Sequence, residues 1–126
     1  SKIKAEYQAA YDLLSPQNRL YNDAAKAFAK FVKKYPQYPL AHNAHYWLGD
    51  AKYVSKKNAE ALKAFELLVS RYPDSTKAPG ALFKIGRLQQ AVGNKSAARA
   101  SFERVLKDYP DSPAAGLARQ RLEQLR

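Results

Sequence analysis

The sequence predicts an all-α protein made of three copies of one helix pair followed by a capping helix. Phe28, Phe65 and Phe102 recur every 37 residues, and a Tyr-Pro pair recurs at the same spacing. A fixed period of this size is the signature of a repeat protein, in which each copy is one supersecondary unit. Apolar residues recur every three or four positions, as in helices, and no stretch alternates between apolar and polar residues as a strand would. We therefore expect a single domain over residues 1–126, with repeats at about 3–36, 40–73 and 77–110 and a capping helix at about 113–125.

The first repeat is expected to contain helices over residues 2–14 and 21–34. Ser15-Pro16 ends the first helix, and Pro36 ends the second, because proline lacks an N–H and pushes the preceding residue out of the helical region. The apolar stripes that support these helices are Ile3, Tyr7, Ala10, Tyr11 and Leu14, and then Ala24, Ala25, Phe28, Phe31 and Val32.

The second repeat is expected to contain helices over residues 40–55 and 58–71. Pro39 suits the first turn of a helix, and Tyr72-Pro73 ends the second one. The inward stripes are Ala41, Ala44, Trp47, Leu48 and Ala51, and then Ala61, Leu62, Phe65, Leu68 and Val69.

The third repeat and the capping helix carry the clearest end signals. Asp74, Ser75 and Thr76 offer capping oxygens to a helix that has Pro79 in its first turn. Gly93-Asn94 supplies the turn that follows, since glycine tolerates the left-handed conformation. The next helix is expected over residues 96–107, and Ser112-Pro113 starts a last helix whose outer face is polar, as a capping helix requires.

The charge is the one unusual feature of the composition. The formal net charge is +11, with 22 Lys and Arg against 11 Asp and Glu, spread along the chain. The densest group is Lys26, Lys30, Lys33 and Lys34, which we interpret as a solvated helix face. No apolar run is long enough to span a membrane. The chain starts at Ser1 without an apolar signal region, and we expect further sequence upstream.

The sequence offers no catalytic or metal-binding arrangement. It has no cysteine, which excludes thiolate metal sites, cysteine nucleophiles and disulfides. His42 and His45 are the only histidines and have no second group of ligands nearby. No glycine-rich phosphate loop or nucleophile elbow is present. We therefore expect no enzymatic activity, no cofactor and no bound metal, with His45 used in helix packing.

The repeat resembles the tetratricopeptide pattern of Leu-Gly, Ala, Phe and Pro. The second copy reads Leu48-Gly49, Ala61, Phe65 and Pro73, and the third reads Ile85-Gly86, Ala98, Phe102 and Pro110. The first copy departs from it, because Asp12 stands at the glycine position, so we expect its helix pair to be splayed. The resemblance implies a right-handed superhelical array of three helix pairs.

A narrower resemblance rests on the run Asn43–Asp50 (NAHYWLGD) joined to repeats that end in Tyr-Pro-Asp-Ser. These features are similar to the C-terminal domain of the periplasmic Tol-Pal accessory proteins, the CpoB or YbgF family. The resemblance implies a periplasmic, non-enzymatic adaptor that binds TolA and helps to coordinate peptidoglycan synthesis by a bifunctional penicillin-binding protein with outer-membrane constriction in cell division. It also implies a homo-oligomer formed through an N-terminal coiled coil that has no counterpart in this chain.

The candidate functional site is a protein-binding groove lined by the first helix of each pair. Side chains that share one face of these helices are Asn43, Tyr46, Asp50 and Tyr53, and, one period later, Phe83, Arg87 and Gln90. Mixed aromatic and polar side chains suit peptide recognition. The alternative is that Tyr46, Tyr53 and Phe83 pack between repeats, and Trp47 is expected to pack in the core. A clamp for a terminal carboxylate has only Asn43, Lys84 and Arg87 to support it.

The sequence is also compatible with three other functions. The charge of +11 allows a nucleic-acid or anionic-surface binding module, although its even spread argues against one. The domain could instead only space or oligomerise a larger protein. Outer-membrane assembly lipoproteins have similar Tyr-Pro-Asp-Ser repeats, and such a scaffold is the alternative identity.

Overall fold

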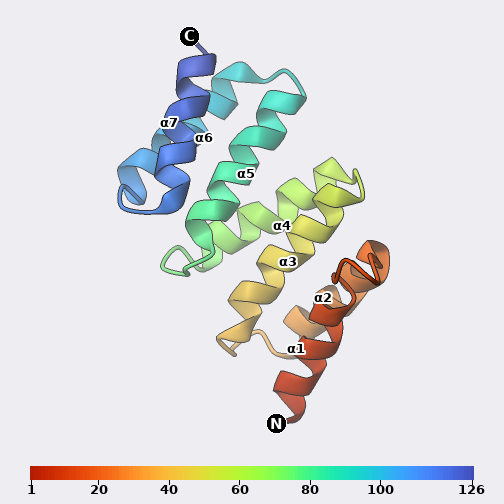
Figure 1. The fold of residues 1–126 in the computed structure, drawn as a ribbon. Helices are drawn as coiled ribbons and strands as arrows, with labels where there is room; N and C mark the ends of the chain where they lie inside the picture. The colour runs from red at the N-terminus through yellow and green to blue at the C-terminus, as the bar shows by residue number, and fades with distance from the viewer. The chain divides into compact units, whose positions relative to one another are not determined.

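The computed structural model describes all residues from Ser1 to Arg126 and is entirely helical (Figure 1). Its helices are α1 (Lys2–Asp12), α2 (Tyr21–Lys34), α3 (Leu40–Val54), α4 (Asn58–Arg71), α5 (Ala78–Ala91), α6 (Lys95–Asp108) and α7 (Pro113–Gln124). The predicted all-α class is therefore confirmed, and each of the expected helices is present. None of them is long and apolar enough to cross a membrane. The handedness of the array and the single-domain organisation stay predictions.

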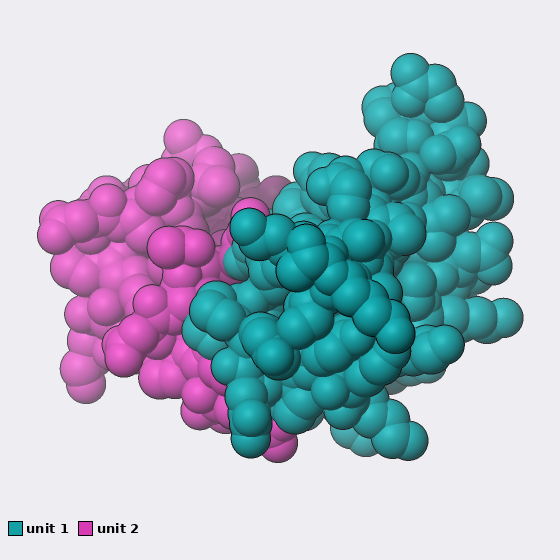
Figure 2. Space-filling view, turned by 90° about the horizontal axis from the view of Figure 1, so that it is seen from below, with its two compact units in different colours: residues 1–67 teal, residues 68–126 magenta.

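The chain forms two compact units, residues 1–67 and 68–126, which Figure 2 shows in different colours. Unit 1 contains α1, α2, α3 and the greater part of α4, and unit 2 contains the end of α4 with α5, α6 and α7.

The core of unit 1 is built around the buried rings of Phe28 and Phe31 on α2. The ring of Tyr7 lies edge-on to both, with centroids 5.8 Å and 5.7 Å away. Ala10, Ala24 and Ala44 fill the remaining buried positions, and small side chains there let α1, α2 and α3 approach closely. These are inward positions that the apolar stripes had predicted.

In unit 2, α5, α6 and α7 pack against one another around the fully buried Phe102. The ring of Phe83 lies 5.4 Å from that of Phe102. The hydroxyl of Tyr109 donates a hydrogen bond of 2.6 Å to the carbonyl of Pro73, which ties the end of α6 to the loop before α5.

The repeated glycines are explained by the repeated phenylalanines. A Cβ added to Gly49 would lie 2.6 Å from the ring of Phe65, and one added to Gly86 would lie 2.5 Å from the ring of Phe102. Real Cβ atoms do not approach other carbons so closely, because such contacts are strongly repulsive. Each glycine therefore lets a ring pack directly against the backbone of the other helix in its pair.

The first repeat departs from this pattern at the end of α1, which stops at Asp12 and not at residue 14 as predicted. Pro16 has no N–H to donate to the carbonyl of Asp12. That carbonyl accepts hydrogen bonds from the N–H of Ser15 at 3.2 Å and from the side-chain amide of Asn18 at 2.9 Å. The N–H of Leu20 donates to the carbonyl of Leu13 and closes the loop. Asp12 corresponds to Gly49, so α1 ends early in the repeat whereas α3 continues to Val54.

The helix ends confirm most of the expected capping residues and correct one. Gly93 has a φ of +83°, and Ser112 Oγ accepts the N–H of Ala115 at the start of α7. For α5, however, the expectation that Asp74, Ser75 and Thr76 cap the helix is wrong. The N-cap is Lys77, which makes no side-chain cap, and Ser75 Oγ accepts the N–H of Lys77 before the helix begins.

Candidate functional site

Four of the predicted groove residues lie on one face of α3 in unit 1, and we call them the α3 face: Asn43, Tyr46, Asp50 and Tyr53. All four are partly exposed. The ring of Tyr46 lies 5.2 Å from that of Trp47 and 5.8 Å from that of Phe65, so one edge of Tyr46 is held by the core. The side chain of Asn43 interacts with the hydroxyl of Tyr7 and partly opposes the rise in the pKa of that group. The α3 face therefore combines positioned aromatic rings with polar groups.

The other three predicted groove residues lie on α5 in unit 2 and differ from one another in exposure. Arg87 is partly exposed. Phe83 is only 7% exposed and packs on Phe102, so its ring belongs to the core of unit 2 and offers little surface to a partner. The side-chain carbonyl of Gln90 is buried and accepts no hydrogen bond. A groove that joins these residues to the α3 face stays a prediction.

A second feature of unit 1, which the sequence did not predict, is a pocket of 390 Å³ beside Trp47, and we call it the Trp47 pocket. Its aromatic residues are Tyr11, Tyr21 and Trp47, and its charged residues are Asp12 and Asp50. The rings of Tyr11 and Trp47 meet nearly at right angles, at 71°, with centroids 5.2 Å apart.

The Trp47 pocket exists because α1 ends early. Beyond Asp12 the chain turns away through the Ser15-Pro16 loop, and no further turn of α1 accompanies the second half of α3. Val54, near the end of α3, is left 47% exposed and lines the pocket. The two sequence signals that could have revealed the pocket are the proline and the aspartate at the glycine position, both departures from the repeat.

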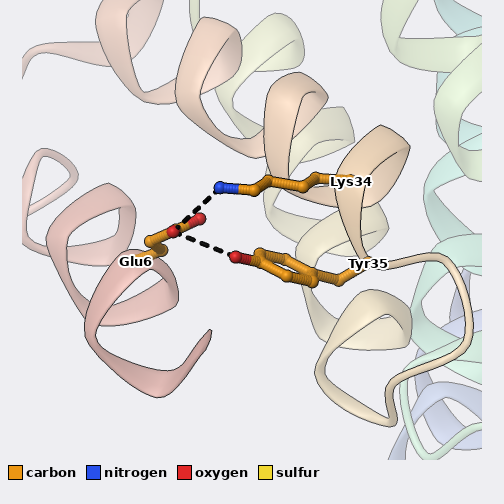
Figure 3. A network of polar contacts seen from close by, with 3 residues as sticks. All are labelled: Glu6, Lys34 and Tyr35. Atoms are coloured by element: carbon orange, nitrogen blue, oxygen red, sulfur yellow. Dashed lines mark hydrogen bonds and ion pairs between the residues drawn. The ribbon is translucent and has the colours of Figure 1, made fainter. Parts of the chain in front are cut away.

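A polar network holds α1 to the end of α2 (Figure 3). Glu6 Oε1 accepts hydrogen bonds from Lys34 Nζ at 3.1 Å and from the hydroxyl of Tyr35 at 3.0 Å. The hydrogen bond from Lys34 is the main reason why the pKa of Glu6 is lowered, and Tyr35 adds to it. Glu6 and Lys34 also line a cleft of 530 Å³ between α1 and α2, together with the buried Ala10 and Phe31.

The remaining charged and imidazole groups give no sign of a reactive centre. Lys26, Lys30, Lys33 and Lys34 are all exposed, as expected of a solvated face. His45 is 6% exposed and packs inside unit 1, as predicted. No three side chains of the types His, Cys, Asp and Glu come together in a way that could hold a metal ion.

Comparison with protein families finds the tetratricopeptide repeat in most of the chain. One tetratricopeptide-repeat model matches residues 7–76, and a second matches residues 80–112. Among curated proteins, the chain is similar to the cell division coordinator CpoB of Pseudomonas putida, with 42% identity over 50 residues, and of Escherichia coli K12, with 42% identity over 48 residues. These matches cover 40% and 38% of this chain and 18% of each relative, so the matched segment is less than a fifth of the relatives' length.

Solved structures show the same fold at low sequence identity. The first TPR of Spaghetti (RPAP3), bound to an HSP90 peptide, matches with a TM-score of 0.75 and 21% identity, covering 98% of this chain and 90% of that one. MamA matches with a TM-score of 0.70 and 20% identity, covering 98% of this chain and 71% of that one. At this level of identity, the two similarities establish the fold alone.

Proposed function

This chain belongs to the tetratricopeptide-repeat family, and we propose that it is a non-enzymatic, protein-binding adaptor of the Tol-Pal cell-envelope system. The observation that carries the proposal is the 42% identity over 50 residues to the cell division coordinator CpoB. The NAHYWLGD run and the Tyr-Pro-Asp-Ser repeat ends, which resemble the same family, agree with it.

The α3 face supports a role in protein binding. Stacked helix pairs present the first helix of each pair as an extended recognition surface. On α3 this surface carries Tyr46 and Tyr53 beside Asn43 and Asp50, all partly exposed. Tyrosine is enriched among the residues that dominate binding energy, because its rigid ring buries a large area and its hydroxyl forms hydrogen bonds.

The partner and compartment follow from the resemblance to the CpoB family. We propose that the protein acts in the periplasm, that it binds TolA, and that it helps to coordinate peptidoglycan synthesis by a bifunctional penicillin-binding protein with outer-membrane constriction. Because the matched segment covers 18% of the relatives, each of these statements is a proposal for this chain.

Titration of the domain with TolA tests the proposal. We expect saturable binding, followed through the fluorescence of Trp47, the only tryptophan. Tyr53→Ala and Arg87→Ala should each weaken the dissociation constant about tenfold, which corresponds to roughly 1.4 kcal/mol. Lys63→Ala, at an exposed position on α4 that is not among the predicted groove residues, is the control and should leave the affinity unchanged.

Two outcomes would overturn parts of the proposal. No binding of TolA would remove the proposed partner. Saturable binding that is unaffected at Asn43, Tyr46, Tyr53 and Arg87 would remove the groove. A nucleic-acid binding module would instead show affinity for DNA that falls steeply with salt, because counterions are released on binding.

A further inference from the structure

The Trp47 pocket has the chemistry of a site for a cationic side chain. We propose that it binds a lysine or arginine side chain carried by a protein partner. This inference rests on the proposed protein-binding function and adds the chemistry of one contact to it. It concerns unit 1 alone, because every residue that lines the pocket lies between Tyr11 and Val54.

The aromatic residues of the pocket favour a cation. Tyr11 and Trp47 stand nearly at right angles with centroids 5.2 Å apart, and Tyr21 lines the pocket with them. The face of an aromatic ring carries negative electrostatic potential and attracts a nearby ammonium or guanidinium group, most strongly when the ring is tryptophan. The indole of Trp47 is held in place by a hydrogen bond to Tyr7, so this corner of the pocket is formed before a ligand arrives.

The charges of the pocket favour the same sign of ligand. Asp12 and Asp50 line it, and none of the residues that line it is a lysine or an arginine. The charged residues that line the pocket are Asp12, whose Oδ1 accepts a hydrogen bond of 2.7 Å from Gln8 Nε2, and Asp50. These carboxylates attract a cationic side chain and repel an acidic one.

The apolar residues and the volume favour a long side chain over a small ion. Leu14, Pro16 and Val54 also line the pocket, and Val54 is 47% exposed. Lysine and arginine have an aliphatic stem that covers apolar surface while the charged end stays near polar groups. The pocket volume of 390 Å³ lies at the lower end of the range of about 300–1,000 Å³ for ligand sites, which suits one such side chain.

Blocked pentapeptides test the proposal directly. Each has the form acetyl-Ala-Ala-X-Ala-Ala-amide, with X being lysine, arginine, norleucine or glutamate. Trp47 is the only tryptophan, so its indole N–H gives one assigned signal in the ¹H–¹⁵N spectrum. We expect the lysine and arginine peptides to shift this signal saturably with dissociation constants of roughly 1–10 mM. Norleucine has the same stem without the charge, and equal shifts with norleucine or glutamate would overturn the proposal. So would the absence of shifts with every peptide.

Charge-matched variants separate the pocket from the general field of the protein. Asp12→Asn removes one carboxylate of the pocket and should weaken binding of the lysine peptide about fivefold. Asp111→Asn removes an equal charge at an exposed position that does not line the pocket, and should leave binding unchanged. Equal weakening by the two variants would overturn the proposal. The dispersion of the same spectra shows whether each variant is folded.

The same samples distinguish this proposal from the proposed function. If the lysine peptide does not bind while TolA does, the pocket proposal fails and the adaptor function stands. If the lysine peptide binds and TolA does not, the pocket stands and the proposed partner fails.

Discussion

Trp47 on α3 donates a hydrogen bond of 3.0 Å from its Nε1 to the hydroxyl of Tyr7 on α1. Both residues are partly buried, and burial raises the pKa of Tyr7 above its usual value. The bond connects the first helix of one repeat with the first helix of the next. It also fixes the indole that forms one side of the Trp47 pocket.

Removal of the Tyr7 hydroxyl should destabilise unit 1. Tyr7→Phe leaves the ring in place and deprives Trp47 Nε1 of this acceptor, which should lower the free energy of unfolding by about 1–2 kcal/mol. Urea denaturation followed by tryptophan fluorescence measures the change. Tyr11→Phe is the control, because Tyr11 is 41% exposed and its hydroxyl can be hydrated, so we expect a change of less than about 0.5 kcal/mol. Equal stability of the two variants would contradict the role of this bond.

The glycines of the second and third repeats should not tolerate a methyl group. Gly49→Ala and Gly86→Ala place a Cβ 2.6 Å and 2.5 Å from buried phenylalanine rings, and should each cost about 1–3 kcal/mol. Gly116→Ala in α7 is the matched control, because its Cβ would meet nothing within 4 Å. Since alanine is the better helix former, Gly116→Ala should stabilise the protein by about 0.5–1 kcal/mol. Thermal unfolding of the three variants measures the two expected losses of stability and the one expected gain. A stabilising Gly49→Ala would refute the steric role of the glycine beside Phe65.

The carboxyl group of Glu6 should make stability depend on pH. Its hydrogen bond from Lys34 holds the pKa of Glu6 below the ordinary value of 4.5. A carboxyl with a lowered pKa in the folded state stabilises the protein above its unfolded pKa, and this stabilisation is lost as the pH falls through the folded pKa.

Glu6→Gln should therefore be less stable than the parent protein at pH 7, and the difference should shrink once the pH falls below about 4.5. Melting temperatures between pH 7 and pH 3 measure this. Glu103→Gln, at an exposed position on α6, controls for the loss of one negative charge. A difference that stays constant over this pH range would argue against the network of Figure 3.

The buried side-chain carbonyl of Gln90 should lower the stability of the protein. It accepts no hydrogen bond, and an unsatisfied buried acceptor costs about 1–3 kcal/mol. Gln90→Met keeps the length of the side chain and removes the carbonyl, so it should raise the free energy of unfolding by about 1 kcal/mol. Gln89→Met is the control with the opposite sign, because Gln89 Oε1 accepts a hydrogen bond of 2.6 Å from Ser101 Oγ. Urea denaturation measures whether Gln90→Met raises the free energy of unfolding and Gln89→Met lowers it.

The repeat made the helices predictable. It did not predict how deeply the side chains at equivalent positions of two repeats are buried. Tyr46 and Phe83 occupy equivalent positions one period apart, and the sequence predicts the same role for both, either on a binding face or in packing between repeats. In the structure Tyr46 is partly exposed, whereas Phe83 is 7% exposed against Phe102. Helical periodicity gives the direction of a side chain around its own helix. It does not say how much of the side chain is buried by other helices.

The sequence by itself determined the seven helices, their inward stripes and the recurrence of glycine and phenylalanine at a spacing of 37 residues. These features are local or are repeated at a fixed spacing, so spacing is enough to find them. Only the tertiary structure showed that α1 ends at Asp12, whose carbonyl accepts hydrogen bonds from the N–H of Ser15 and from the side-chain amide of Asn18. Only the tertiary structure showed that Tyr11, Tyr21 and Trp47 line one pocket. Such contacts join residues far apart in the chain, and they depend on where a loop turns, which no periodic pattern encodes.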